Sequence, residues 1–239
     1  VVDPRTSDTA KLAHEHLRIK PGGDPFLLMS LIQVLFDEDR VNPGRLSDHI
    51  TGVDTVRELC RPFSPEAVEK RTGIDPALVY RIARELAAAP SAAVYGRMGT
   101  STVEFGALAN WLVDVLNILT GNLDRAGGAM FPTPAHMPHR SRPGGKGWVL
   151  GRWKSRVKGL REVMGELPVC TLCDEIETPG KGQVRALITV ASNPVIALPN
   201  SDRVDRALAG LDFMVSVDFY LNASTRHAHV ILPPTGPLS

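Results

Sequence analysis

The sequence predicts an α/β protein of two Rossmann-like parallel-sheet lobes, with a helical insertion at about residues 40–90. Short apolar runs that resemble strands alternate with longer helical patterns, and turns rich in glycine, asparagine or aspartate follow those runs. Such alternation is typical of parallel sheets, which bind ligands beyond the carboxyl ends of their strands. We expect a first lobe over residues 1–130, an irregular loop over 131–160 and a second lobe over 161–239.

Helix starts follow the strand stub Val1-Val2 in the first lobe. Asp24-Pro25 is a strong start, because a carboxylate can accept hydrogen bonds from free backbone amides and proline suits the first helical position. Ser64-Pro65 and Asp75-Pro76 repeat the signal inside the helical insertion. These patterns predict helices over most of the first lobe.

A strand, a glycine turn and a helix are predicted at the end of the first lobe. Ala92–Tyr95 is typical of a short buried strand, Gly96–Thr102 of a glycine turn, and Phe105–Leu119 of a long helix that ends at Gly121. A turn placed after a strand would allow its backbone amides to approach phosphate oxygens.

The loop predicted over residues 131–160 is basic and rich in glycine and proline. No acidic residue lies between Asp124 and Glu162, whereas arginine and lysine recur throughout that stretch. Such a run is most often a solvated surface loop. The alternative is a basic loop that lines an access channel and attracts an anionic ligand.

The second lobe returns to alternating strands and helices. We expect a strand over Arg185–Val190, a turn over Ala191–Pro194, a helix near Asp202–Ala209 and a strand over Phe213–Val217. Asp218 comes directly after the last of these strands. The turn and Asp218 should therefore lie at one edge of a parallel sheet.

Composition is that of an ordinary soluble globular protein, with 43% hydrophobic residues, 22% charged residues and a net charge of +1. The charge gives no reason to expect nucleic-acid binding. The apolar run Phe26–Phe36 is too short to span a bilayer. Because the sequence starts at Val1 without a basic and apolar leader, we expect an internal fragment of a cytoplasmic protein, with export of the parent left open.

The cysteines favour a reducing compartment, because three of them make no complete disulfide framework. Cys170 and Cys173 form a Cys-x-x-Cys pair within a helical pattern that also carries Leu172 and Ile176. No second pair completes four zinc ligands. We therefore interpret the pair as structural.

Matching residues near the two ends of the chain indicate an internal repeat. The strand-like segments Val1–Asp3 and Val215–Asp218 both end in aspartate. Residues of related type then follow at equal offsets, namely Thr9 and Ser224, Ala13 and Ala228, His14 and His229, and Leu17 and Leu232. Two similar α/β units would provide two related ligand-binding crevices, although so few matches could also arise by chance.

The predicted turns carry side chains suited to a nucleotide. An aspartate can accept hydrogen bonds from guanine or ribose, an arginine can neutralise a diphosphate, and glycines let backbone amides approach phosphates. Each signal also has a purely structural interpretation, since Asp24 can simply start a helix and a Gly-x-x-Gly turn is common. His227 and His229 could chelate a metal only on an extended strand, and no third ligand lies near them in sequence.

Taken in order, these segments resemble the molybdopterin oxidoreductase family, which includes formate dehydrogenases and nitrate reductases. The resemblance spans nearly the whole chain. It rests on Val1-Val-Asp-Pro-Arg-Thr6, Leu17-Arg-Ile-Lys-Pro-Gly-Gly-Asp24, Phe63-Ser-Pro-Glu66, Thr72-Gly-Ile74, Tyr95-Gly-Arg-Met-Gly99, Leu119-Thr-Gly-Asn122, Gly127-Gly128, Val190-Ala-Ser-Asn-Pro194 and the segment from Asp218 to Pro233.

The resemblance implies that the chain binds the guanine dinucleotide tails of a bis-molybdopterin cofactor carrying molybdenum or tungsten. It also implies a parent enzyme that performs two-electron redox chemistry on a small-molecule substrate, with an electron-transfer subunit or carrier as a possible partner. The metal ligand and a 4Fe-4S cluster are expected upstream of the chain, which alone is expected to be inactive. The implied cofactor-binding residues are Asp3, Arg5, Gly22, Gly23, Asp24, Gly96, Gly99, Ser192, Asn193, Pro194 and Asp218.

Some positions depart from the family pattern. Gly23 replaces the usual threonine, His14 and His229 stand where aspartate is usual, and Ala223 stands where glutamate is frequent. These departures affect the assignment of single residues more than the family resemblance. The alternative function is a non-catalytic α/β scaffold or subunit-contact module from a degenerate family member. A nicotinamide dehydrogenase is disfavoured, because no Gly-x-Gly-x-x-Gly turn is present.

Overall fold

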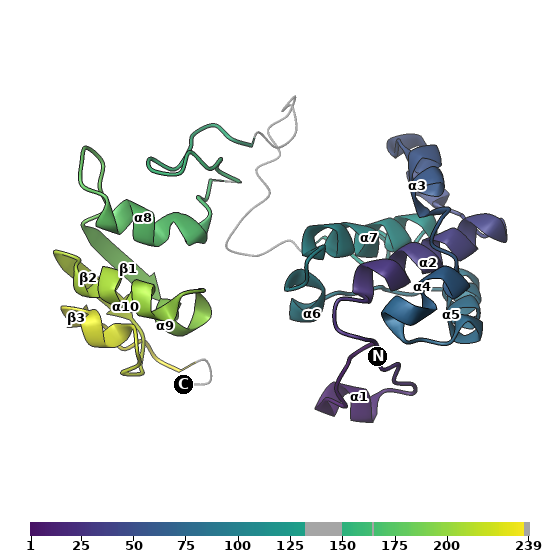
Figure 1. Ribbon diagram of the computed structural model, residues 1–239, viewed down its shortest axis with the longest axis horizontal. Helices are drawn as coiled ribbons and strands as arrows, with labels where there is room; N and C mark the ends of the chain where they lie inside the picture. Colours follow the sequence, from purple (N-terminus) through teal and green to yellow (C-terminus); the bar gives the residue numbers. More distant parts are fainter. Residues whose placement is uncertain (132–149, 164, 237–239) are drawn as a thin grey trace. The chain divides into compact units, whose positions relative to one another are not determined.

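The computed structural model describes residues 1–131, 150–163 and 165–236. The chain divides into two compact units, Val1–His139 and Arg140–Ser239, which we call the first and second units (Figure 1). Each unit is described by itself. Helices accompany a parallel sheet in the chain as a whole, so the predicted α/β class is confirmed.

The first unit is built around helix α2, Asp24–Asp37. Ile32, Val34 and Leu35 of this helix are fully buried, and α3, α4, α5 and α7 pack against it. Helices between residues 44 and 88 lie where the sequence indicated an insertion. The remaining helices of the unit are α1 (Asp8–Leu12), η1 (Gly44–His49), α3 (Val53–Cys60), α4 (Pro65–Thr72), α5 (Pro76–Ala88), α6 (Met98–Ser101) and α7 (Gly106–Leu119).

The parallel sheet predicted for the first lobe is not found among residues 1–131. Val2 and Leu17 form one isolated parallel bridge, and Ala92–Tyr95 forms no strand. The side chain of Asn117 explains this difference, because its Oδ1 accepts from the Val94 amide at 2.9 Å and its Nδ2 donates to the Val94 carbonyl at 2.9 Å. A side-chain amide thus satisfies the backbone groups that a neighbouring strand would otherwise bind.

The second unit contains a parallel sheet of order β1-β2-β3 in the part of the chain that is described. Helices α8, α9 and α10 pack with Met214 of β2 in one core. The elements are η2 (Val169–Thr171), α8 (Leu172–Glu177), β1 (Ala186–Val190), α9 (Pro194–Ala197), α10 (Ser201–Ala209), β2 (Phe213–Val217), η3 (Thr225–His227) and β3 (Val230–Ile231).

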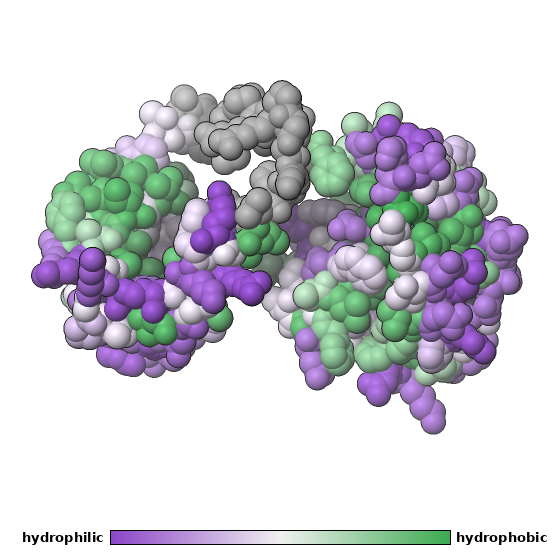
Figure 2. Space-filling model, turned by 90° about the horizontal axis from the view of Figure 1, so that it is seen from above, coloured by the Kyte–Doolittle hydropathy of each residue, from purple (hydrophilic) through white to green (hydrophobic). Residues whose placement is uncertain are grey.

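One face of β1 remains accessible in the second unit. Ile188 is 69% exposed and Val190 is 66% exposed, whereas Thr189 between them is buried. Figure 2 shows hydrophobic residues gathered in patches on the surface of each unit. The alternation along β1 means that the helices cover only one side of this strand.

Candidate functional site

Two segments of the chain repeat the same backbone arrangement 215 residues apart, as the sequence pattern predicted. In the first, the Leu17 amide donates to the Val1 carbonyl at 2.9 Å. In the second, the Leu232 amide donates to the Ser216 carbonyl at 2.8 Å. Both bonds join parallel backbone segments. In each repeat, the first residues therefore pair with the last ones in the same way.

The turns inside the two repeats match as well. Asp3 Oδ1 accepts from the Arg5 amide at 2.7 Å, and Asp218 Oδ1 accepts from the Tyr220 amide at 2.9 Å. Each aspartate therefore folds back on the residue two positions later, which is an Asx turn.

The short helical turns that follow are capped at equivalent positions. Ser7 Oγ accepts from the Ala10 amide at 3.3 Å, and Asn222 Oδ1 accepts from the Thr225 amide at 3.0 Å. The predicted internal repeat is therefore confirmed over residues 1–17 and 216–232. We call its two Asp turns, with the residues around them, the first and second half-sites.

The first half-site brings two carboxylates close enough to interact. Asp24 is half-buried at the start of α2, and its pKa is raised mainly by burial, with a further contribution from the negative charge of Asp3. The helix begins at Asp24 as predicted, but its N-cap is Gly23. No hydrogen bond joins the Asp24 carboxylate to another residue within residues 1–131. Its oxygens are therefore available to donors outside the protein.

Gly22 and Gly23 shape the backbone that leads into Asp24. Gly22 has a φ of +81°, a region that favours glycine. A Cβ atom on Gly23 would lie 2.9 Å from the Lys20 carbonyl oxygen and 3.2 Å from that of Arg71. The glycine found in place of the usual threonine therefore fits a close approach of the surrounding backbone.

The segment from Gly96 to Thr102 is not the open glycine turn that the sequence suggested. Residues Met98–Ser101 form helix α6, and a Cβ on Gly96 would lie 2.6 Å from Thr100 Oγ1, whereas Gly99 has open space around it. Phe105, just before α7, stacks edge-on against Phe26 of α2 at a centroid distance of 6.5 Å. This contact holds the start of α7 beside the start of α2.

The second half-site lies at the carboxyl ends of two neighbouring strands. Val190 of β1 is in register with Val217 of β2, so Ser192-Asn193-Pro194 and Asp218 emerge at the same edge of the sheet, as predicted. Ser192 is exposed, Asn193 is half-buried and Asp218 is buried. Pro194 is the first residue of α9, where its fixed φ suits a helix start.

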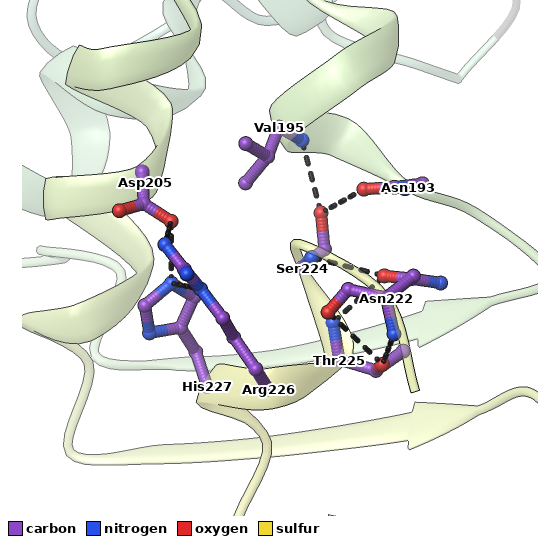
Figure 3. A network of polar contacts seen from close by, with 8 residues as sticks. All are labelled: Asn193, Val195, Asp205, Asn222, Ser224, Thr225, Arg226 and His227. Carbon is purple, nitrogen blue, oxygen red and sulfur yellow. Dashed lines mark hydrogen bonds and ion pairs between the residues drawn. The ribbon is translucent and has the colours of Figure 1, made fainter. Parts of the chain in front are cut away.

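Ser224 fixes the orientation of the Asn193 side chain (Figure 3). Its Oγ accepts from the Val195 amide at 2.9 Å and donates to Asn193 Oδ1 at 2.7 Å. Because the Ser224 hydroxyl has one proton, which goes to Asn193, the oxygen of that amide must face Ser224. The Asn193 Nδ2 group makes no hydrogen bond to the described part of the chain and remains a free donor.

Asp218 is held inside its own turn. Besides the Tyr220 amide, it accepts from Asn222 Nδ2 at 3.2 Å, and Asn222 Oδ1 in turn accepts from the amides of Ser224 and Thr225. The Thr225 hydroxyl donates to the Tyr220 carbonyl at 3.0 Å. Asp218 thus positions the turn between residues 218 and 225.

Ser224, Asn222 and Thr225 are site residues that the sequence reasoning did not select. Their residue types, all frequent in side-chain-capped turns, were the available signal. The partner of Ser224 lies 31 residues away at Asn193, so the sequence alone could not show that this serine reaches the site.

The basic stretch before residue 163 is tied to the second unit where it is described. Arg152 binds the buried Glu162, whose carboxyl pKa falls to about 2 because of that hydrogen bond. Arg156 binds Glu175 at 3.1 Å. These two arginines therefore stabilise the fold. Residues 132–149, where most of the predicted channel-lining loop falls, lie outside the described residues.

The histidines near the second half-site have structural partners. His227 and Arg226 both contact Asp205 of α10, at 2.7 and 2.6 Å (Figure 3). His229 Nδ1 accepts from the Met214 amide at 3.1 Å. Since His227 belongs to a 3-10 turn, the extended pair that metal chelation would need is not formed. Among the described residues no cluster of three metal-binding side chains occurs.

Comparison with known proteins identifies relatives of the whole chain. The family model described as molybdopterin oxidoreductase matches residues 1–236. The F420-dependent formate dehydrogenase subunit alpha of Methanocaldococcus jannaschii is 25% identical over 98% of this chain and 36% of its own length. The assimilatory nitrate reductase catalytic subunit of Bacillus subtilis is 24% identical over 99% of this chain and 35% of its own length.

The fold has a solved counterpart in acetylene hydratase from Pelobacter acetylenicus, with a TM-score of 0.77. The two sequences are 20% identical, and the match covers 97% of this chain and 36% of that one. The chain therefore spans about a third of the length of the relatives it matches. In the described part of the chain, every helix is too short or too polar to cross a bilayer.

Proposed function

The chain belongs to the molybdopterin oxidoreductase family, and from that premise we propose that its two half-sites hold the two guanine dinucleotide tails of a bis-molybdopterin cofactor. When bound, such a cofactor supplies the molybdenum or tungsten centre for two-electron oxidation or reduction of a small-molecule substrate. The parent protein would exchange those electrons with a partner subunit or carrier. The observation that carries the proposal is the hydrogen-bonded Asp turn, which occurs once in each unit with the same backbone geometry.

The first half-site fits a guanine or ribose. The Asp24 carboxylate is half-buried, has a raised pKa and receives no hydrogen bond from another residue in the described part of the chain. The N1–H and 2-amino groups of guanine, or two ribose hydroxyls, would donate to its oxygens and offset the cost of burial. Arg5 is exposed and forms no ion pair within the described residues, so its guanidinium can bind a diphosphate.

The second half-site offers hydrogen-bond donors to the other dinucleotide tail. The free Asn193 Nδ2 group and the exposed Ser192 hydroxyl can both donate to phosphate or carbonyl oxygens. Asp218 acts here as a positioning residue, because two of its hydrogen bonds hold the turn that carries Ser224. Gly96 and Gly99 would contribute backbone surface to the first half-site, and Gly99 has open space around it.

Replacing Asp24 tests the proposal in the full-length parent. Asp24→Asn keeps the shape of the side chain but turns one acceptor into a donor. Loss of a charged hydrogen bond of about 1.5–3 kcal/mol corresponds to roughly 10- to 100-fold weaker binding of the nucleotide. We expect less molybdenum or tungsten and less guanosine monophosphate, released by acid hydrolysis, per mole of purified protein.

The matched control is Asp54→Asn, which changes an exposed aspartate of α3 that belongs to neither half-site. It should retain the cofactor content of the wild type. Equal metal and nucleotide content in Asp24→Asn and the wild type would contradict the assignment of Asp24. A folded wild-type parent that contains neither metal nor guanine nucleotide would instead favour the non-catalytic scaffold.

A further inference from the structure

Cys170 and Cys173 lie side by side on a surface that the proposed cofactor site does not use. Both line a hollow of about 210 Å³ beside α10, together with Leu198, Arg203 and Val204. Cys170 is exposed and Cys173 is buried, and both are reduced. A purely structural role accounts for the buried thiol but leaves the exposed one without a function.

The backbone places the two thiols on the same side of one helical turn. Cys170 belongs to η2 and Cys173 to α8, and the intervening Thr171 and Leu172 both have right-handed helical dihedral angles. Residues three apart on a helix have Cβ atoms about 5–6 Å apart, whereas a disulfide needs about 3.5–4.5 Å. Closing the bond therefore needs a shift of roughly 1–2 Å.

The segment that would move is short, and of its three residues only Thr171 is buried. η2 has three residues, and Val169 before Cys170 is 56% exposed. Cys173, by contrast, is anchored in the core of the second unit. The exposed cysteine can therefore approach the buried one without disturbing that core.

The two thiols differ in reactivity. Burial raises the pKa of the Cys173 thiol, and the positive charge of Arg203 partly offsets this rise. Cys170 is exposed to solvent, so a disulfide reagent in solution reacts with Cys170 before Cys173. The remaining cysteine, Cys60, is buried in the first unit and its thiol pKa is raised to about 11 by burial, which makes it unreactive at neutral pH.

We propose that Cys170 and Cys173 form a redox-active dithiol, which low-molecular-weight disulfides such as glutathione disulfide convert to an intramolecular disulfide. The Cys170 thiolate attacks one sulfur of glutathione disulfide and releases one glutathione thiolate. The Cys173 thiolate then attacks Cys170 Sγ and displaces the second glutathione. Two protein thiols are oxidised, one glutathione disulfide is reduced to two glutathiones, and the two thiol protons balance the two leaving thiolates.

The closed disulfide would join η2 to the helix that Arg203 already clamps. Arg203 of α10 binds Asp174 at 2.8 Å and Glu177 at 2.7 Å, both on α8. The cross-link would therefore add a covalent bond to the wall of the hollow that η2 and α8 form. The predicted modification adds a constraint without breaking an existing contact.

Peptide mapping of the full-length parent tests the proposal. The reduced protein is incubated with glutathione disulfide, unfolded in the presence of N-ethylmaleimide and digested with trypsin. The tryptic peptide over residues 162–181 contains both cysteines and no other. We expect this peptide to lack two hydrogens and to carry no maleimide, while the peptide with Cys60 is fully labelled.

Two variants identify the order of attack. Cys173→Ser should accumulate a glutathione adduct on Cys170, because the second thiol is missing. Cys170→Ser should remain largely unmodified, because Cys173 is buried. The proposal is overturned if the wild-type peptide carries two maleimides, or if it carries a stable glutathione adduct as abundant as that of Cys173→Ser. The wild-type measurement decides the matter even where a variant folds poorly.

Discussion

The two repeats share their backbone hydrogen bonds but differ in how firmly each is held. The second repeat continues a three-stranded sheet, and its Asp218, Ser224 and Thr225 are buried. The first repeat consists of one isolated bridge, with Val1 and Val2 each 43% exposed. The same local geometry is therefore supported by a sheet in one unit and, in the other, by an isolated bridge in a segment where Ala10 and Leu17 are the buried residues.

The difference shows that repeated geometry does not imply repeated use of side chains. The Asp218 carboxylate accepts from both Tyr220 and Asn222, whereas the Asp3 carboxylate accepts only from the Arg5 amide among the described residues. Thr9, at the position equivalent to Ser224, is exposed and makes no hydrogen bond through its side chain within residues 1–131. The second half-site uses polar side chains to hold its turn, while the first leaves the Asp24 carboxylate without a hydrogen bond to another of the described residues.

The largest effect on stability should come from Ser224→Ala compared with Thr9→Ala. Removing the Ser224 hydroxyl leaves the buried Val195 amide without an acceptor and frees Asn193, at a cost of about 1–3 kcal/mol. Thr9→Ala should change stability by less than about 0.5 kcal/mol. Hydrogen exchange of peptides covering residues 191–198 and 1–17 measures both. Equal effects of the two substitutions would mean that the repeats are supported alike.

A smaller difference is expected between Asn222→Ala and Ser7→Ala, which remove the equivalent caps. Asn222 Oδ1 accepts from two amides at 2.9 and 3.0 Å, whereas Ser7 Oγ accepts from one at 3.3 Å. We expect about 1–2 kcal/mol for Asn222→Ala and about 0.5–1 kcal/mol for Ser7→Ala. Denaturant unfolding of each variant gives the comparison, and the reverse order would show that bond number does not set the cost.

Sequence patterns predicted the elements whose formation depends on nearby residues. The helix expected over Phe105–Leu119 is observed as Gly106–Leu119, and the strand over Phe213–Val217 has the bounds that were predicted. Residues of related type at the same offsets after Asp3 and Asp218 indicated the repeat, whose hydrogen bonds the structure shows. In each case periodicity or a cap within the element carries the information.

What the sequence could not provide are partners distant along the chain. Val94 was expected in a strand, but its backbone pairs with the side chain of Asn117, which no local pattern indicates. Asp24 was recognised as a helix start, while the proximity of Asp3 that raises its pKa follows only from the folded chain. The role of Ser224 likewise depends on Asn193.

A pH-dependent comparison comes from two glutamates, one in each unit, whose pKa values both fall to about 2. Arg84 and Arg40 bind Glu38 in the first unit, and Arg152 binds Glu162 in the second. Because these pKa values lie below the ordinary value of 4.5, each carboxylate stabilises the folded state above about pH 4.5, and this stabilisation is lost as the pH falls toward 2.

In the Glu38→Gln and Glu162→Gln variants, the urea concentration at the unfolding midpoint should therefore fall less between pH 5 and pH 2.5 than it does in the wild type. Urea titrations of each variant and the wild type over that range measure the change. Because Glu162 is fully buried and Glu38 is partly exposed, solvent screens the Glu162 ion pair less, and its variant should show the larger difference from the wild type. If the curves of both variants run parallel to that of the wild type, neither ion pair carries the acid sensitivity of its unit.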